Sequence, residues 1–429
     1  MAGAHPSGIE LSGAADQPRP TLVVIGLAFV TTLAGHFTLD RLGLTIPVLN
    51  DSRVLLFSAV VMSFVLEATA ASRRAGSRVT RLGAALGTRR CLHPVLVLFG
   101  YQMLSASWAP PGAVINDVLT DLVAETVLVC VYAALAEWDG DRVIRITLTS
   151  LYGAAWLYFL YAASGRGHTA SGRWAAFGGG PNVFVRVMIL GMLAAVYLYC
   201  RDGDRLIWLI GVPPFLVGAL GSGSRGGLTA LGITAGVALP RLWRILGTRR
   251  FIRPLVLFAV MCAALWSVFG PTVVALSQNR LAVATLKEHY TSGRDVLYEK
   301  GLEVFYEHPV LGVGVHGFSV SANVGSAGIY VHNLPLAVAA EGGVVGVMLL
   351  IAAFIALRRE YARVPYRRRS LEARTAASCG ILIGCAGLFS GDYYDSRLMW
   401  IFFLLAAVRP PSDQRQESSS PRTEPSIRY

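Results

Sequence analysis

Residues 331–357 read VHNLPLAVAAEGGVVGVMLLIAAFIAL, and this stretch indicates the class of protein to which the chain belongs. Apart from His332 near its start, the stretch contains one ionisable side chain, Glu341. A run of roughly 20 apolar residues is long enough to cross the hydrocarbon core of a bilayer as a helix. The stretch therefore predicts a membrane-spanning helix with a polar, histidine-containing entrance.

The composition of the whole chain agrees with this prediction. The chain has 429 residues, of which 54% are hydrophobic and 15% charged, and its mean hydropathy is +0.53. Such a composition leaves too little polar surface for an ordinary soluble domain. We expect an all-α integral membrane protein with about twelve transmembrane helices in a polytopic domain over residues 21–408. The apolar runs are 21–36, 54–70, 92–107, 114–136, 143–163, 181–200, 204–220, 226–246, 253–277, 331–357, 374–390 and 393–408.

Arginines concentrate in three of the connections between these runs. The connections are 71–91, 241–253 and 358–374. Basic residues near the ends of membrane helices stay on the cytoplasmic side, and the three connections share one side if the twelve runs alternate. We therefore expect a multi-pass protein of the plasma membrane with both termini in the cytoplasm. The longest polar connection, 278–330, then lies outside, together with 164–180 and 221–225.

The formal net charge of +12 is explained by this topology, because the excess arginines lie beside anionic lipid headgroups. We expect membrane lipids as partners and no nucleic acid. Residues 1–20 are expected to form a cytoplasmic N-terminal tail before an uncleaved first span. Residues 409–429 are rich in Ser, Pro and Arg and are expected to form a disordered cytoplasmic tail. The six cysteines lie in or beside predicted spans, which makes a disulfide framework unexpected.

Three ionisable residues on the outer side are candidate functional groups. Arg225 lies in a glycine-rich turn, Arg294 precedes a predicted loop helix over 295–307, and His332 opens the tenth span. Charged groups against a membrane are costly and commonly mark a site. Two guanidinium groups can bind and neutralise a pyrophosphate without a metal ion. We therefore consider Arg225 and Arg294 as a pyrophosphate-binding pair.

The start of the tenth span adds to this anion-binding character. Asn333 is a suitable helix cap and Pro335 fits the first turn, so that free amides and the positive end of the helix dipole lie near His332. A neutral imidazole is well suited to accept a proton from an attacking alcohol. His332 is therefore the candidate general base.

Each of the three residues also has a structural explanation. Arg225 is explained as an arginine at a membrane boundary, Arg294 as a solvated loop charge paired with Asp295, and His332 as a helix cap or packing residue. Their occurrence together on one predicted face favours a shared site.

Other polar residues of the outer side are harder to assign. The histidines at 289, 308 and 316 lack the close spacing of zinc motifs, and no acidic cluster accompanies them, so we expect no metal and no cofactor. Glu341 lies inside the tenth helix, either as a buried partner of an arginine or as a polar lining residue. Asp392 and Asp395 either line an acceptor path or cap the last outer turn.

Glycines in the tenth span have an expected structural role. Gly342 and Gly346 are four residues apart, which indicates close packing of this helix against a neighbour. Gly343 lies between them, and we expect the three glycines to hold His332 in position.

Several of these motifs together resemble a known family. His332-Asn333 followed after nine residues by Gly343-Val-Val-Gly346 resembles the signature of the O-antigen ligase and polymerase family, membrane enzymes that transfer whole glycans from a lipid pyrophosphate. The segment Glu307–Phe318, EHPVLGVGVHGF, follows an arginine that opens a loop helix, as in that family, and Ser224-Arg225-Gly226 is similar to its other arginine motif. The resemblance covers roughly residues 205–408.

The resemblance implies a function for the candidate residues. A glycan on a polyprenyl pyrophosphate would be the donor, and the acceptor would be a hydroxyl of a glycan, a lipid or a protein. His332, Arg225 and Arg294 would carry out a metal-independent, inverting transfer at the outer face, with Asn333 in the binding region. Arg280 is the alternative to Arg294 as second arginine.

Two other classes remain open. A transporter or flippase of lipid-linked glycans would also have twelve spans and outer arginines, although the sequence shows no inverted repeat. A metal-dependent transferase using a lipid monophosphate sugar would need paired acids in its first outer loop, where only the well-separated Asp40 and Asp51 occur. The sequence does not distinguish a ligase from a polymerase.

Overall fold

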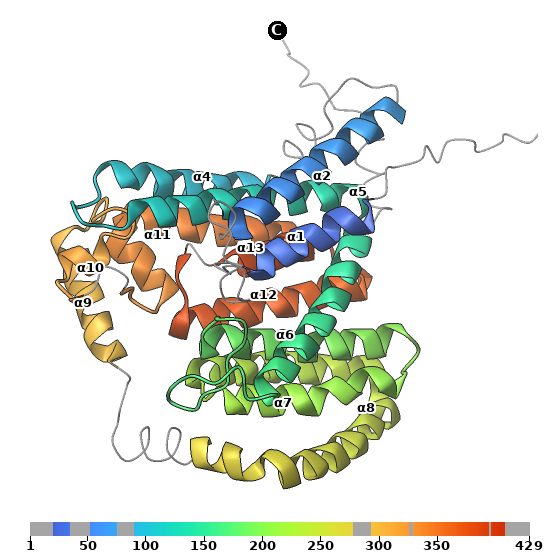
Figure 1. The fold of residues 1–429 in the computed structure, drawn as a ribbon. Helices are drawn as coiled ribbons and strands as arrows, with labels where there is room; N and C mark the ends of the chain where they lie inside the picture. The colour runs from blue at the N-terminus through green and yellow to red at the C-terminus, as the bar shows by residue number, and fades with distance from the viewer. Residues whose placement is uncertain are drawn as a thin grey trace, which may run out of the picture.

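The computed structural model describes residues 20–34, 52–74, 90–277, 293–325, 329–393 and 396–407. Within these ranges the regular elements are helices, and the extended backbone pairs only in two isolated bridges at 168–179 (Figure 1). The expected all-α class is confirmed for the described part of the chain. Residues 1–19 and 408–429, which comprise nearly all of the predicted tails, lie outside it.

The helices are listed here in chain order with their bounds. They are α1 Leu22–Ala34, α2 Ser52–Arg74, α4 Leu92–Leu104, η2 Ser105–Ser107, α5 Ile115–Ala163, α6 Pro181–Arg201, η3 Leu206–Gly211, α7 Val212–Gly221, α8 Arg225–Ser277, α9 Arg294–Glu307, α10 Phe318–Ser321, α11 Leu334–Ala362, η5 Tyr366–Arg368, α12 Leu371–Ser390 and α13 Arg397–Ala406.

Each of the twelve predicted apolar runs overlaps a helix or one arm of a helix. Two long helices, α5 and α8, each contain two of the runs and are interrupted where the sequence predicted a connection. Four of the described helices, α5, α6, α11 and α12, are long and apolar enough to cross a membrane. The number of crossings and the side on which each loop lies remain predictions.

The interruption of α5 has a clear local cause. The sequence Glu137-Trp-Asp-Gly-Asp-Arg142 places charged residues and a glycine between two apolar runs. Asp139 has non-helical backbone angles, and its Oδ1 accepts a hydrogen bond of 3.1 Å from the amide of Arg142. The side chain of Asp139 therefore caps the second arm of the helix.

Small residues allow the helices to approach closely. The helix α6 packs against α5, α7 and α12, and α12 also packs against α8 and α13. A Cβ atom at Gly380 of α12 would lie 2.8 Å from the Phe403 ring of α13. Glycine at such a position permits the close helix contacts that are frequent in membrane proteins.

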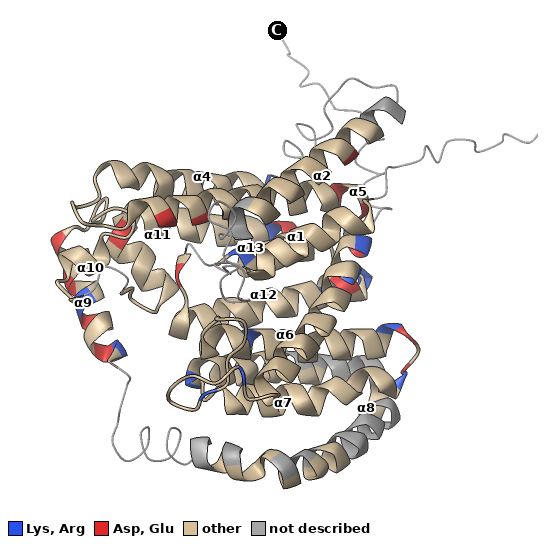
Figure 2. Ribbon diagram, viewed as in Figure 1, with Lys and Arg blue, Asp and Glu red and all other residues tan. Residues whose placement is uncertain are grey.

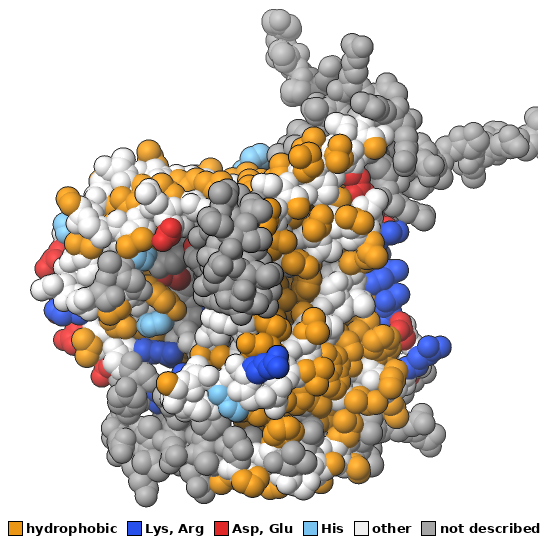
Figure 3. Space-filling model, in the orientation of Figure 1, with side chains coloured by type: hydrophobic (Ala, Val, Ile, Leu, Met, Phe, Trp, Pro, Cys, Tyr) orange, Lys and Arg blue, Asp and Glu red, His pale blue; other side chains and the backbone are white. Residues whose placement is uncertain are grey.

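The distribution of charge agrees with a membrane environment. Most of the charged residues drawn in Figure 2 lie near the ends of the helices. Hydrophobic side chains gather over the right and lower parts of the face drawn in Figure 3. Apolar residues such as Leu157 and Leu160 of α5 are exposed. Extended exposed apolar surfaces of this kind mark contact with a membrane or a partner.

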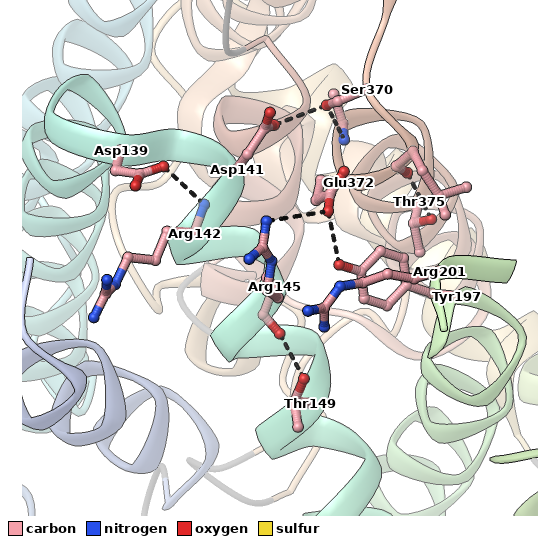
Figure 4. A network of polar contacts seen from close by, with 12 residues as sticks. Asp139, Asp141, Arg142, Arg145, Thr149, Tyr197, Arg201, Ser370, Glu372 and Thr375 are labelled. Atoms are coloured by element: carbon pink, nitrogen blue, oxygen red, sulfur yellow. Dashed lines mark hydrogen bonds and ion pairs between the residues drawn. The ribbon is translucent and has the colours of Figure 1, made fainter. Parts of the chain in front are cut away.

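A polar network joins three helices at the end of the bundle that the sequence assigns to the cytoplasm. The hydroxyl of Tyr197 donates to Oε1 of Glu372 at 2.9 Å, and the guanidinium of Arg145 lies 3.9 Å from the same oxygen (Figure 4). The Ser370 hydroxyl hydrogen-bonds to Oδ1 of Asp141 at 2.8 Å. These contacts hold α5, α6 and α12 together at the end opposite to His332.

Candidate active site

The N-terminal end of α11 forms the first part of the candidate site. Asn333 is its N-cap, because Oδ1 of Asn333 accepts a hydrogen bond of 3.0 Å from the amide of Leu336, and Pro335 lies in the first turn. His332 therefore precedes the helix, with a φ of 61° in the left-handed region that non-glycine residues rarely adopt. The predicted cap is confirmed, and it places the imidazole at the positive end of the helix dipole.

The C-terminal end of α12 connects the starts of three other helices. Nδ2 of Asn333 donates to the carbonyl of Leu388 at 3.1 Å. Two residues further on, Oγ of Ser390 accepts from Nδ2 of Asn182 in α6 at 2.7 Å, and Oδ1 of Asn182 accepts from Oγ of Ser224 at 2.8 Å. The starts of α6, α8 and α11 are thereby fastened to one segment.

Arg225 is the first residue of α8 and follows Ser224 directly. The glycines around it are needed for packing, because a Cβ at Gly226 would lie 2.5 Å from Cβ of Phe389, and one at Gly227 would overlap Val185. Gly223 has a φ of 58°, which closes the turn. The half-buried Arg225 is thus held next to the end of α12.

Arg294 is the first residue of α9, after Gly293 with a φ of 71°. The helix packs against α11, where the space at Gly301 is limited by Leu336 at 3.1 Å and Val331 at 3.2 Å. Burial, together with the positive charge of Arg294, lowers the pKa of His332 from 6.5 to about 4. The charge of Arg294 therefore acts on the imidazole of His332, which is neutral at pH 7.

The imidazole of His332 packs against an aromatic ring. The ring centroids of Tyr330 and His332 are 3.9 Å apart, and the hydroxyl of Tyr298 lies 3.5 Å from the carbonyl oxygen of His332. Nδ1 of His332 is buried and has no hydrogen-bond partner among the described residues. Packing, rather than a polar partner, orients this ring in the described part of the chain.

The helix α11 is interrupted at Gly343, where the apolar run 331–357 predicted a continuous span. The φ and ψ of Gly343 are 61° and −162°, a combination that is essentially restricted to glycine. The amide of Val344 donates to the carbonyl of Pro309 at 2.8 Å, and the amide of Gly314 donates to the carbonyl of Glu341 at 2.9 Å. The segment 309–314 therefore fills the break in α11 with backbone hydrogen bonds.

The three glycines of α11 have different surroundings. Cβ atoms at Gly342 and Gly346 would lie 3.3 and 3.5 Å from Cε1 of Tyr101, so these two glycines face α4 closely. A Cβ at Gly343 would overlap the carbonyl of Val310. Gly342 and Gly346 thus have the helix-packing role that their spacing indicated, whereas Gly343 admits the backbone of segment 309–314.

Glu341 is 5% exposed and stabilises the same segment. Its carboxylate accepts hydrogen bonds from the amides of His316 at 2.8 Å and Phe318 at 3.4 Å, and from the hydroxyl of Tyr393. From the sequence, an arginine partner or a polar lining role was expected for Glu341. The contacts show instead that Glu341 joins the segment around His316 and Phe318 to α11 and to the turn before α13.

The remaining candidates do not join this cluster. Arg280, His289 and Asp395 lie outside the described residues. His308 is exposed at the end of α9, whereas His316 is buried, and burial lowers its pKa. Oδ1 of the buried Asp392 accepts from the amide of Tyr393 at 2.8 Å. Within the described ranges no three His, Cys, Asp or Glu side chains are arranged to hold a metal ion.

Sequence reasoning missed several residues that build the site. Arg186 of α6 donates to the carbonyl of Ser390, next to Asn182. An arginine five residues inside the predicted span 181–200 was a usable signal, because such a group needs a polar partner in the membrane. Asn182 and Ser390 gave no such signal, since their pairing depends on the fold.

Comparison with known proteins gives one family. A family model described as O-antigen ligase matches residues 210–351, a range that contains Arg225, Arg294 and His332. No curated protein matches the chain. The resemblance to the O-antigen ligase and polymerase family that the motifs indicated is therefore confirmed over this region.

Proposed function

From the O-antigen ligase family region at residues 210–351, which indicates glycan transfer in general, we propose a specific reaction. The protein transfers an oligo- or polysaccharide from a polyprenyl-pyrophosphate donor to an acceptor hydroxyl at the outer face of the plasma membrane. His332 accepts the proton of the acceptor, and Arg225 and Arg294 bind the pyrophosphate. The reaction uses no metal ion and inverts the anomeric configuration.

The proximity of Arg294 to His332 is the observation that carries this proposal. The guanidinium charge acts on the imidazole strongly enough to contribute to its lowered pKa. The hydrogen bonds from Asn333 to Leu388 and from Ser224 through Asn182 to Ser390 bring the start of α8 into the same region. These contacts support the proposal that the base and the two cations act at one site.

The chemistry follows from these groups. A lone pair of the acceptor oxygen attacks the anomeric carbon while His332 takes the hydroxyl proton. The bond from that carbon to the pyrophosphate oxygen breaks, and the electron pair leaves with the lipid pyrophosphate. Arg225 and Arg294 stabilise the negative charge that grows on the leaving group. One displacement from the opposite side of the sugar inverts its configuration.

The low pKa of His332 in the protein without donor is compatible with its role as a base, because the anionic donor changes the charge beside it. Without donor, the positive charge of Arg294 disfavours a second positive charge on the imidazole. A bound pyrophosphate offsets the charge of Arg294 and favours the imidazolium, which raises the pKa of His332. The donor thus makes His332 a stronger base at the moment when a base is needed.

The test compares membranes of the native host carrying wild-type protein, the variant His332→Ala or the control His308→Ala. We expect His332→Ala to accumulate the lipid-pyrophosphate glycan, accessible from outside the cell, while surface glycan falls. The exposed His308 should be replaceable without effect. Accumulated donor that is inaccessible from outside would favour the transporter class instead, and unchanged donor and surface glycan would overturn the proposal. The length of the missing glycan distinguishes a polymerase from a ligase.

A further inference from the structure

A cavity lies at the end of the bundle opposite to His332. It has a volume of about 490 Å³ and opens between the C-terminal parts of α6, α11 and α13 and the N-terminal part of α12. This volume falls within the range of roughly 300 to 1,000 Å³ that is common for small-molecule sites. Residues of the candidate active site do not line it, so the cavity is separate from that site.

The lining changes from apolar to basic along the helices. Leu193 of α6, Phe354 of α11 and Ile381 of α12 line the part nearer the middle of the bundle, whereas Arg358 and Arg374 line the part at its end. The cavity follows α11 from Phe354 to Tyr361, a length of about 10 Å at a rise of 1.5 Å per residue. The cavity thus has an apolar inner part and a cationic outer part.

Arg374 is held in position at the cavity. Its Nη2 donates to the carbonyl of Arg369 at 2.8 Å, and its guanidinium lies 5.3 Å from the centroid of the Tyr366 ring. Nη1 of Arg374 makes no hydrogen bond within the described residues. A fixed guanidinium with remaining N–H donors is suited to phosphate oxygens.

A second arginine is buried behind the side chains that line the cavity. Arg369 is 2% exposed, stacks on Tyr361 with 3.7 Å between its Cζ and the ring centroid, and donates from Nη1 to the carbonyl of Ala406 at 2.9 Å. Its Nε and Nη2 have no hydrogen-bond partner among the described residues. Tyr361 and Ala406 both line the cavity, so this charge adjoins it.

Nearby acids do not cancel the positive charge. Residues 358–374 contain seven arginines and two glutamates, a net charge of +5. Glu360 pairs with Arg363 at 2.8 Å, and Glu372 is engaged by Tyr197 and Arg145 (Figure 4). Arg358 makes no hydrogen bond or ion pair with the described residues and is exposed. The outer part of the cavity is therefore attractive to an anion.

We propose that this cavity binds an anionic phospholipid of the cytoplasmic leaflet, with an acyl chain against Leu193, Phe354 and Ile381 and the headgroup phosphate on Arg358 and Arg374. The apolar inner part of the cavity suits the acyl chains of such a lipid, and the cationic outer part suits its anionic headgroup. The proposal does not depend on the glycan transferase function. It concerns a site at the other end of the helices.

The test measures phospholipid retained by the purified full-length protein in native mass spectrometry, after addition of phosphatidylglycerol or phosphatidylcholine. Wild-type protein should retain phosphatidylglycerol in preference. The double variant Arg358→Gln/Arg374→Gln should retain it at least about tenfold more weakly, because hydrogen bonds between charged groups are worth about that factor or more. The matched control Arg367→Gln/Arg368→Gln removes the same charge from exposed residues of η5 that do not line the cavity, and should retain the lipid.

A second variant tests the apolar part separately. Leu193→Trp fills the inner cavity, keeps both arginines and should also lose the lipid, and thermal melting in detergent checks that each variant is folded. Equal loss in both double variants would show general surface attraction and overturn the site. Retention by Arg358→Gln/Arg374→Gln, or displacement of the lipid by inorganic phosphate alone, would also overturn it.

Discussion

Replacing Arg294 with glutamine should raise the pKa of His332, but only part of the way to its ordinary value. Burial is the larger cause of the lowering from 6.5 to about 4, and the charge of Arg294 is the smaller. Removal of the smaller cause therefore recovers less than half of the difference, so the pKa rises but stays well below 6.5. The imidazole of the variant stays neutral at pH 7 and becomes charged as the pH falls through its raised pKa.

The pKa can be measured without turnover, by ¹⁵N NMR of the histidine side chains of labelled protein in detergent micelles. The His332 signal is identified by its absence in His332→Gln. The matched control is Lys300→Gln, which removes a positive charge from the same helix, where Lys300 is paired with Glu303. This control should leave the pKa of His332 unchanged. An unchanged pKa in Arg294→Gln would refute the proximity of the two groups, and a rise to 6.5 would refute the dominance of burial.

Three further outcomes are expected. Gly343→Ala should reduce the melting temperature and the yield of folded protein, because the backbone strain alone costs about 1–3 kcal/mol and the new Cβ overlaps Val310. The control Gly236→Ala in α8, where a Cβ would have no atom within 4 Å, should reduce neither. Equal melting temperatures of the two variants would contradict this prediction. Glu341→Gln should lower the free energy of unfolding by about 1–3 kcal/mol, since an amide cannot accept all three hydrogen bonds. A thermal melt as stable as wild type would show that these bonds are dispensable. Purified protein should transfer glycan at the same rate with and without EDTA, and a rate restored only by added divalent cation would rule out metal-independent transfer.

The sequence was sufficient for features that depend on local pattern. The apolar runs predicted where helices lie, Asn333 and Pro335 predicted the start of α11, and the loop helix expected at 295–307 is α9 at Arg294–Glu307. These features follow from composition and capping, which a single sequence displays directly.

Features that depend on distant contacts could not be predicted in this way. The break at Gly343 occurs because segment 309–314 supplies backbone partners there, and Glu341 is satisfied by amides more than twenty residues away. The pairing of Asn182 with Ser390 joins positions separated by 208 residues. Sequence periodicity does not identify partners that are distant along the chain. The contacts around His332 could therefore be found only in the folded structure.

The position of Ser390 near the end of the described chain has a consequence for biosynthesis. Asn182 and Arg186 of α6 can form their hydrogen bonds with Ser390 only when α12 has been made. During synthesis, α6 therefore enters the membrane with polar side chains that lack their final contacts, and the insertion of α12 completes these contacts late. The candidate active site should accordingly be among the last parts of the protein to mature, and a chain that ends before α12 should keep its earlier helices but lack an organised site.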